Sequence, residues 1–102
     1  MFDKTDSECG AGKRISVLCD KKKLLELLAE LEHDRWARWQ KHVHAVCEHR
    51  PDGSLLIPSD RVKGWERQIN TTYFDLSEKE QISDQEEAYR TIHLLESLGM
   101  EF

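Results

Sequence analysis

The stretch from Lys21 to Val46 constrains the fold of this chain more than any other. Its apolar residues recur at the spacing that gathers side chains along one side of an α-helix. Asp20 directly precedes the stretch and is a suitable N-cap, because its carboxylate can accept a backbone hydrogen bond from the first turn. We therefore predict a long amphipathic helix over residues 21–46. Its apolar side consists of Leu24, Leu25, Leu27, Leu28, Leu31, Trp36, Trp39, Val43 and Val46.

Turn-forming residues follow this helix. The segment 49–53 contains proline and an Asp-Gly pair, which predict that the helix ends there. The apolar segment 54–58 is either extended or a packed loop. A second helix is expected to begin at Ser59 or Asp60 and to end at residues 70–72. Its apolar residues are Val62, Trp65 and Ile69.

Two capping-box patterns mark the last part of the chain. Ser77 and Ser83 are each followed three residues later by glutamate. We predict a short helical turn at about 78–82 and a final helix at about 84–98, with Gly99 as its C-terminal stop. The apolar stripe of this final helix is expected to contain Ala88, Ile92 and Leu95.

The predicted fold class is a mainly α, small single domain of three principal helices with short extended segments. Residues 1–20 read as a polar leader whose order the composition leaves open, and residues 14–19 within it could form a short strand. The helical domain itself is expected over residues 21–102. A length of 102 residues suits one domain with a single core, to which the three tryptophans would contribute large apolar areas.

Composition excludes several classes of protein. No apolar run is long enough to suggest a membrane span, and the N-terminus lacks the pattern of a signal peptide, so a cytoplasmic protein is expected. Cys9, Cys19 and Cys47 are odd in number and widely spaced, which favours reduced thiols over a disulfide framework. The formal charge of −5 argues against nucleic acid as a partner, and the basic run 21–23 is interpreted as a solvated helix start.

Two charged residues interrupt the apolar side of the first predicted helix. Glu32 and Arg35 lie three positions apart and could pair with each other at the edge of the domain. Alternatively, they could form the polar floor of a pocket for an anionic or heteroaromatic ligand. His33 and Trp36 flank the same side, where each could serve packing, or could orient and stack on a planar ligand.

A second group of residues with possible metal donors ends the same helix: His42, His44, Cys47 and His49. On a helix, the side chains at positions 42 and 44 point about 200° apart, so they cannot share one ion. The spacing matches no structural zinc pattern. No third group that would orient a base for Cys47 is apparent, so neither a metal site nor a catalytic nucleophile is predicted.

The order of several short motifs resembles the ryanodine-receptor repeat domain. The first helix contains Leu28-Ala29-Glu30, His33 and Trp36-Ala37-Arg38, similar to the L-A-E-x-x-H-x-x-W-A opening of that family. Tyr73-x-x-Leu76-Ser77-Glu78-Lys79, then Asp84 and the stretch from Leu95 to Gly99, resemble its P-Y-x-x-L loop and closing helix. Thr72 replaces the usual proline, and residues 49–70 differ from the glycine- and aromatic-rich middle of the animal repeats. This middle resembles the compact, free-standing forms of bacteria and phages.

The resemblance covers residues 28–99 and implies a small helical binding module without enzymatic activity, cofactor or metal. In the large channels these repeats occur in tandem pairs at the cytoplasmic periphery, and for the free-standing forms the resemblance implies the sensing of a nucleotide-like ligand. We expect the chain to bind a small ligand or a protein partner, with neither membrane nor nucleic acid involved. The alternative is a purely structural or protein-interaction module that forms a homodimer. The residues predicted to bind the ligand are Glu32, His33, Arg35, Trp36 and Tyr73.

Overall fold

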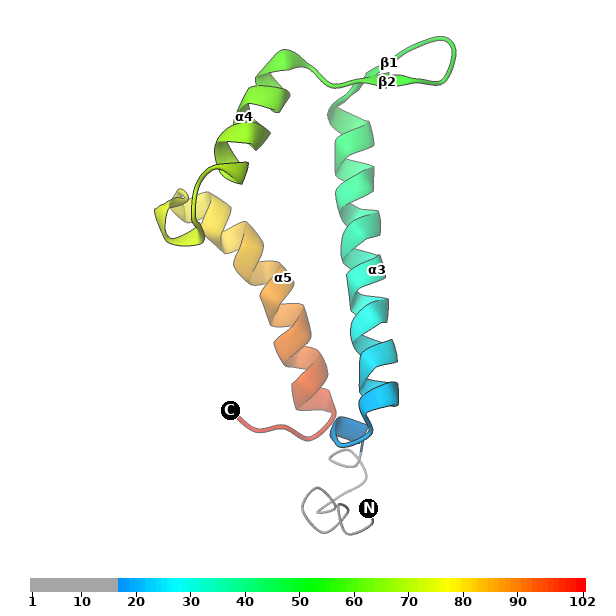
Figure 1. Cartoon of the computed structure of the whole chain (residues 1–102), viewed down its shortest axis with the longest axis vertical. Coiled ribbons are helices and arrows are strands. Elements are labelled where there is room, and N and C mark those ends of the chain that lie inside the picture. Colours follow the sequence, from blue (N-terminus) through cyan, green and yellow to red (C-terminus); the bar gives the residue numbers. More distant parts are fainter. Residues whose placement is uncertain (1–16) are drawn as a thin grey trace. The chain divides into compact units, whose positions relative to one another are not determined.

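The computed structural model describes residues 17–102 and is mainly helical, as predicted (Figure 1). Residues 1–16, which include most of the predicted leader, lie outside the described part of the chain. No helix among the described residues is long and apolar enough to cross a bilayer. The elements are α3 (Lys21–Val46), β1 (Glu48–His49), β2 (Leu55–Leu56), α4 (Ser59–Ile69), the 3₁₀ turn η1 (Tyr73–Asp75) and α5 (Glu78–Ser97).

Helix α3 has the predicted bounds. The backbone N–H of Lys23 donates to the carboxylate of Asp20 at 3.2 Å, which confirms Asp20 as the N-cap. The helix contains neither glycine nor proline, so nothing interrupts its hydrogen bonds before Val46. Cys47 follows directly and is the one buried residue among those described, with 8 % of its surface exposed.

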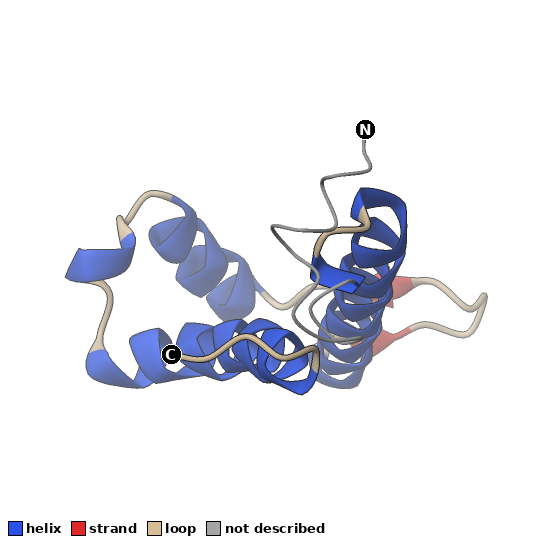
Figure 2. Ribbon diagram, turned by 90° about the horizontal axis from the view of Figure 1, so that it is seen from below, coloured by secondary structure: helices blue, strands red, loops and turns tan. Residues whose placement is uncertain are grey.

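A short antiparallel hairpin reverses the chain after α3 (Figure 2, strands in red). Glu48 pairs with Leu56 and His49 pairs with Leu55. The carboxylate of Asp52 accepts hydrogen bonds from both the backbone N–H and the hydroxyl of Ser54, at 2.9 and 2.6 Å. The next residue of this turn, Gly53, has a φ of 91°, a conformation that glycine adopts without strain. The apolar segment 54–58 is therefore extended at its centre rather than a packed loop.

Helix α4 also matches its prediction. The carbonyl of Pro58 accepts the N–H groups of Arg61 and Val62, which starts the helix without a side-chain cap. At the other end the side-chain amide of Asn70 donates to the carbonyl of Glu66 at 2.9 Å. One expectation is wrong: Ile69, assigned to the apolar stripe, is 78 % exposed because it lies in the last turn, at the end of the helix.

The two helices predicted between residues 78 and 98 are one continuous helix, α5. The first capping box is formed: the Ser77 N–H donates to Glu80 at 3.1 Å, and the Glu80 N–H donates to the Ser77 hydroxyl at 3.2 Å. Ser83 instead lies inside the helix, so the second predicted cap is wrong. A serine only caps where the chain enters a helix, and no glycine or proline separates residues 78 and 97. Ala88, predicted in the apolar stripe, is exposed.

Gly99 ends α5 as predicted, with a φ of 107°. Its N–H donates to the carbonyl of Glu96, and the N–H of Met100 donates to the carbonyl of Leu95, both at 3.0 Å. These two bonds form a Schellman motif, which satisfies carbonyls that the helix end would otherwise leave without donors.

Two expectations for residues near position 20 are wrong where the structure describes them. Val17 and Leu18 are helical, whereas residues 14–19 were expected to form a strand; the remainder of that segment lies outside the described residues. Cys19 is disulfide-bonded, so the expectation of three reduced thiols is also wrong. An odd number of cysteines excludes a complete pairing but leaves one bond possible. Cys47 is a free thiol, as expected.

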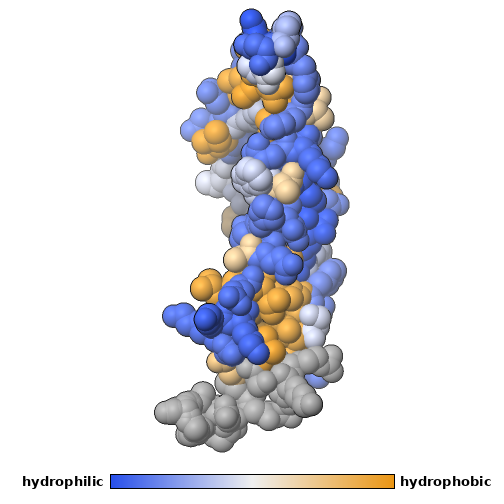
Figure 3. Space-filling model, turned by 90° about the vertical axis from the view of Figure 1, so that its right-hand side faces the viewer, coloured by the Kyte–Doolittle hydropathy of each residue, from blue (hydrophilic) through white to orange (hydrophobic). Residues whose placement is uncertain are grey.

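The chain divides into two compact units. Unit 1 contains the described residues up to Asp34 together with Glu86–Phe102. Its half-buried apolar side chains come mainly from the first half of α3 and the second half of α5. Figure 3 shows an apolar area, in orange, at the end of the molecule where α3 begins. The half-buried apolar residues are Val17 and Leu18 before α3, Leu24, Leu27, Leu28 and Leu31 on α3, Ile92, Leu94 and Leu95 on α5, and Leu98 directly after it.

Unit 2 spans Arg35–Gln85 and contains all three tryptophans. The expectation that they fill a core is wrong for two of them, because Trp36 is 59 % exposed and Trp39 is 47 % exposed. Helical periodicity places both on the apolar side of α3, but it does not say whether another element covers that side. Trp65 is half-buried, as are the smaller apolar residues Val43, Val46, Leu55 and Val62.

Candidate functional site

Four of the five predicted ligand-binding residues lie within two turns of α3. Glu32 and His33 belong to unit 1 and are exposed, whereas Arg35 and Trp36 belong to unit 2. All four take part in interactions within the protein. The helix therefore brings them together along its own length, and the unit boundary falls between the two pairs.

Arg35 is the most enclosed member of this group. The residue is half-buried and its Nε atom is buried, whereas the neighbouring indole of Trp36 is mostly exposed. At four and seven residues beyond Leu31 and Leu28, Arg35 continues the spacing of the half-buried leucines. A guanidinium held partly out of water can bind an anionic group, and an exposed indole can stack on a planar one.

Tyr73, the fifth predicted residue, belongs to η1 and is held against α5. The side-chain amide of Gln81 donates to the Tyr73 carbonyl at 3.0 Å, and that of Gln85 donates to the phenol oxygen at 2.8 Å. Neither glutamine was predicted from the sequence to contact Tyr73. Their spacing of four residues places them on one side of a helix, but nothing in that spacing indicates that a tyrosine lies across it.

The indoles of Trp39 and Trp65 form an edge-to-face pair with centroids 5.4 Å apart and planes at 60°. The imidazole of His42 also lies near Trp39, with the two ring centroids 5.4 Å apart and the planes tilted by 35°. Such pairs hold aromatic rings in fixed orientations. Trp39 therefore presents a positioned, partly exposed aromatic surface on α3.

The histidines and cysteine near the end of α3 do not converge on one point. His42 lies against Trp39, while His49 is in the hairpin, where its Nε2 is 2.9 Å from the carbonyl of His44. Within residues 17–102, no group of three or more histidine, cysteine or acidic side chains has the arrangement of a metal site. His44 therefore contributes its backbone, and not its ring, to this contact.

Unit 1 contains a site that sequence reasoning missed. An open hollow lies along α5, bordered by Glu86, Tyr89, Arg90 and His93. The Tyr89 and His93 rings are stacked, with centroids 5.8 Å apart and planes at 25°. Arg90 forms an ion pair with Glu87 on the same helix, with its Nε atom 3.6 Å from the Glu87 carboxylate oxygen Oε1. The aromatic pair at positions i and i+4 is visible in the sequence and could have indicated this surface.

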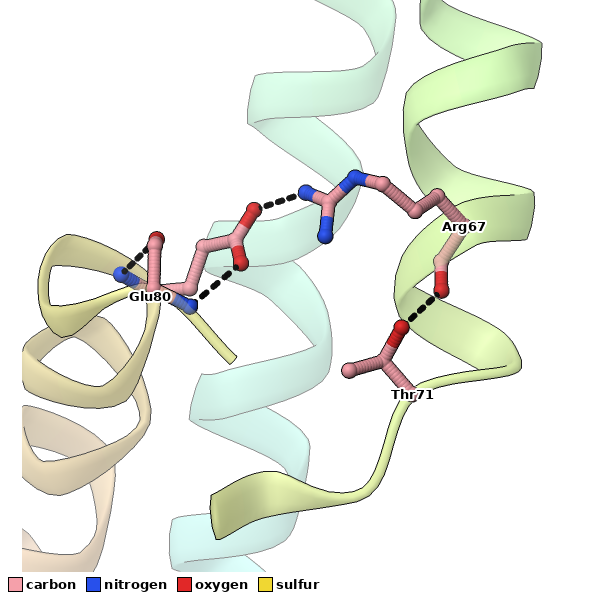
Figure 4. Close-up of polar contacts among 4 residues, drawn as sticks. Arg67, Thr71 and Glu80 are labelled. Atoms are coloured by element: carbon pink, nitrogen blue, oxygen red, sulfur yellow. Dashed lines mark hydrogen bonds and ion pairs between the residues drawn. The ribbon is translucent and has the colours of Figure 1, made fainter. Parts of the chain in front are cut away.

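An ion pair connects α4 to the start of α5 within unit 2 (Figure 4). Arg67 donates from its guanidinium to the carboxylate of Glu80, whose second oxygen accepts the N–H of Ser77. These hydrogen bonds, of which the one from Arg67 is the strongest influence, lower the pKa of Glu80. In the hairpin, the hydroxyl and N–H of Ser54 lower the pKa of Asp52 in the same way. Both carboxylates are thereby kept ionised, and each fixes a turn.

Comparison with known proteins finds no matching family model, no matching curated protein and no matching solved structure.

Proposed function

We propose that this chain is a non-enzymatic helical interaction module, related to the ryanodine-receptor repeat, that associates with a second copy of itself. Its motifs from Leu28 to Trp36 and from Tyr73 to Gly99 support the relationship, because both ends of the repeat occur in order and at similar spacing. Channel repeats occur in tandem pairs. A chain with a single repeat would obtain the equivalent partner by self-association.

The main support for self-association is the pair of exposed indoles on α3. Trp36 and Trp39 lie three positions apart, so they share one side of the helix, and about half of each side chain remains in contact with solvent. Tryptophan is strongly enriched at the centres of protein interfaces because it combines a large apolar area with few rotatable bonds. The contact with Trp65 already orients Trp39, which lowers the entropy cost of burying it.

The energy available from this surface is sufficient for a dimer. Covering the exposed half of one indole removes on the order of 100 Å² of apolar area from water, worth ~2.5 kcal/mol. In a symmetric dimer each residue contributes twice, so the two tryptophans of both copies together provide ~10 kcal/mol before the cost of association. At the lowest cost of association, about 4 kcal/mol, the remaining ~6 kcal/mol corresponds to a dissociation constant of tens of micromolar.

Sedimentation velocity over a concentration series from about 1 to about 300 µM tests this proposal. We expect the average mass to rise toward that of a dimer. Trp36→Ser should weaken association at least about tenfold, because it removes one interface anchor from each copy. Phe102→Ser is the matched control: it also removes an aromatic ring that is mostly exposed, at 77 %, and should leave association unchanged.

A wild-type chain that stays monomeric at the highest concentration would contradict the proposal. Equal effects of Trp36→Ser and Phe102→Ser would contradict the assignment of the surface. Far-UV circular dichroism of each variant checks that α3 is still formed.

A second candidate function is the binding of a small anionic or nucleotide-like ligand. The observations that favour it are the half-buried Arg35, whose Nε atom is buried, and the exposed indole of Trp36 on the same helix. Within unit 2, Arg35 would contact the anionic group, and Trp36 and Tyr73 would supply aromatic rings for stacking.

Thermal shift against a panel of nucleotides tests the ligand hypothesis. A ligand at one hundred times its dissociation constant should stabilise the fold by about 2.7 kcal/mol, which is readily measured. Arg35→Ala should abolish the shift caused by the ligand, whereas Arg61→Ala, which removes an exposed guanidinium on α4, should preserve it. Unchanged melting temperatures with every nucleotide would exclude this function.

A further inference from the structure

The turn between α4 and α5 carries an exposed apolar surface that neither candidate function uses as a whole. Phe74 is 85 % exposed, although it lies in an ordered 3₁₀ turn rather than at a chain end. Its ring contacts that of Tyr73 edge to face, with centroids 5.2 Å apart. Ile82, which is 46 % exposed, lies on α5 between the two glutamines that hold Tyr73. We call Tyr73, Phe74 and Ile82 the aromatic turn surface.

Hydrogen bonds on both sides fix this surface in place. Gln81 and Gln85 bind the carbonyl and the phenol oxygen of Tyr73, so its ring extends along one turn of α5. On the other side of the turn, the Thr72 hydroxyl donates to the carboxylate of Asp75 at 3.0 Å. An apolar residue presented by such a fixed turn loses little conformational entropy when a partner covers it.

The charges around the aromatic turn surface are almost all negative. Residues 69–85 contain four carboxylates and a single basic side chain, Lys79. Glu80 is already paired with Arg67, and Asp84 points about 200° away from Ile82 around α5. Asp75, which follows Phe74, and Glu78, one turn before Ile82, are both exposed. A partner that covers Phe74 and Ile82 would therefore bring its own flanking residues near these two carboxylates. Complementarity requires those residues to be cationic.

We infer that the aromatic turn surface binds a basic amphipathic segment of another protein, in which lysines or arginines flank apolar residues. Phe74 and Ile82 contact the apolar residues of the segment, and the carboxylates of Asp75 and Glu78 contact its cationic side chains. This surface is distinct from the indoles of α3. The inference goes beyond self-association and can hold or fail independently of it.

Fluorescence anisotropy with two labelled probe peptides tests the inference. The first is an amphipathic helical peptide of leucine and lysine, and the second has glutamate in place of every lysine. The lysine peptide should bind, and the glutamate peptide should bind at least about tenfold more weakly. Phe74→Ser should weaken binding of the lysine peptide about tenfold or more, whereas Phe102→Ser should not change it.

Charge variants separate this surface from a general attraction between a cationic peptide and an acidic chain. The double variant Asp75→Asn, Glu78→Gln should weaken binding and reduce its salt dependence. The control double variant Glu26→Gln, Glu30→Gln removes the same number of exposed charges from α3 and should bind as the wild type does. Equal losses in the two double variants would overturn the inference, as would equal effects of Phe74→Ser and Phe102→Ser.

Sedimentation of the Phe74→Ser variant distinguishes this inference from the proposed function. Loss of self-association in that variant would assign the aromatic turn surface to the contact between copies and overturn the inference. A monomeric wild-type chain that binds the lysine peptide as described would support the inference and contradict the proposed function.

Discussion

Arg67 on α4 and Glu80 on α5 form an ion pair, and the same carboxylate of Glu80 closes the capping box of α5. One side chain thus fixes the start of a helix and connects it to the preceding helix. The Arg67 side chain is 54 % exposed and the Glu80 side chain is 20 % exposed. An ion pair that keeps this much contact with solvent contributes little to stability by itself. The consequence of this pair is therefore positional: it sets where α5 begins relative to α4 within unit 2.

Replacing Arg67 with glutamine should raise the pKa of Glu80 toward its ordinary value. The guanidinium is the largest cause of the lowered pKa, while the N–H of Ser77 remains in the variant and keeps part of the effect. A pH titration of the Glu80 carboxyl carbon by NMR measures the change. Lys63→Gln, which removes another exposed positive charge from α4, is the control and should leave the titration where it is.

The lowered pKa of Glu80 also predicts a direction for stability against pH. A carboxyl with a lower pKa in the folded state contributes stability above its unfolded pKa, near 4.3, and this contribution is lost as the pH falls through the folded value. The free energy of unfolding of the wild type should therefore fall toward that of Arg67→Gln as the pH is lowered from about 5 through the lowered pKa. Urea unfolding of both proteins at neutral and acidic pH measures the difference, and a constant difference would contradict the prediction.

Ser77→Ala should destabilise the fold by about 1 kcal/mol, because the first turn of α5 loses its N-cap. Ser83→Ala provides a contrast within the same helix. Ser83 occupies an interior position, where alanine has the higher helix propensity, so its replacement should be neutral or stabilising by up to about 0.5 kcal/mol. Urea unfolding at neutral pH measures both. Similar losses in the two variants would mean that Ser83 also caps a helix in solution.

Two glycines should respond to alanine in opposite directions. Gly99 has a φ of 107°, so Gly99→Ala should cost about 1 kcal/mol or more. Gly64 lies inside α4, and an added methyl group there would meet no atom within 4 Å. Gly64→Ala should therefore stabilise the fold by up to about 1 kcal/mol. Thermal melting followed at 222 nm compares the two variants, and a stabilising Gly99→Ala would refute the Schellman termination of α5.

A double-mutant cycle can measure the contact between Trp39 and Trp65. Replacing each indole with leucine, singly and together, should give a coupling free energy of about 0.5–1.5 kcal/mol, the range for edge-to-face aromatic pairs. The measurement should be made at low protein concentration, where self-association does not contribute to the free energy of unfolding. A coupling near zero would show that the two rings do not pair in solution.

Local signals in the sequence were sufficient for most helix boundaries. Asp20 marks the start of α3 and Gly99 the end of α5, because a cap and a positive φ each act on a few neighbouring backbone groups. Ser77 and Ser83 have the same local pattern, yet only Ser77 is preceded by a 3₁₀ turn. The choice between them depends on how η1 packs on α5, which no window of a few residues contains.

The burial of individual side chains and the surroundings of the candidate site residues depend on tertiary contacts, which helical periodicity does not contain. The pattern of α3 places Leu28, Arg35 and Trp36 on or near one side of the helix. It does not indicate whether another element covers each of these positions. Leu28 and Arg35 are half-buried and Trp36 is mostly exposed. For Tyr73, its partners Gln81 and Gln85 lie on another element, so its environment could only be known from tertiary structure.

The burial of Cys47, at the junction of α3 and the hairpin, makes alkylation an intrinsic reporter on this part of the molecule. A free cysteine with 8 % of its surface exposed should react slowly with iodoacetamide while the fold is intact, so faster labelling reports local unfolding of that junction.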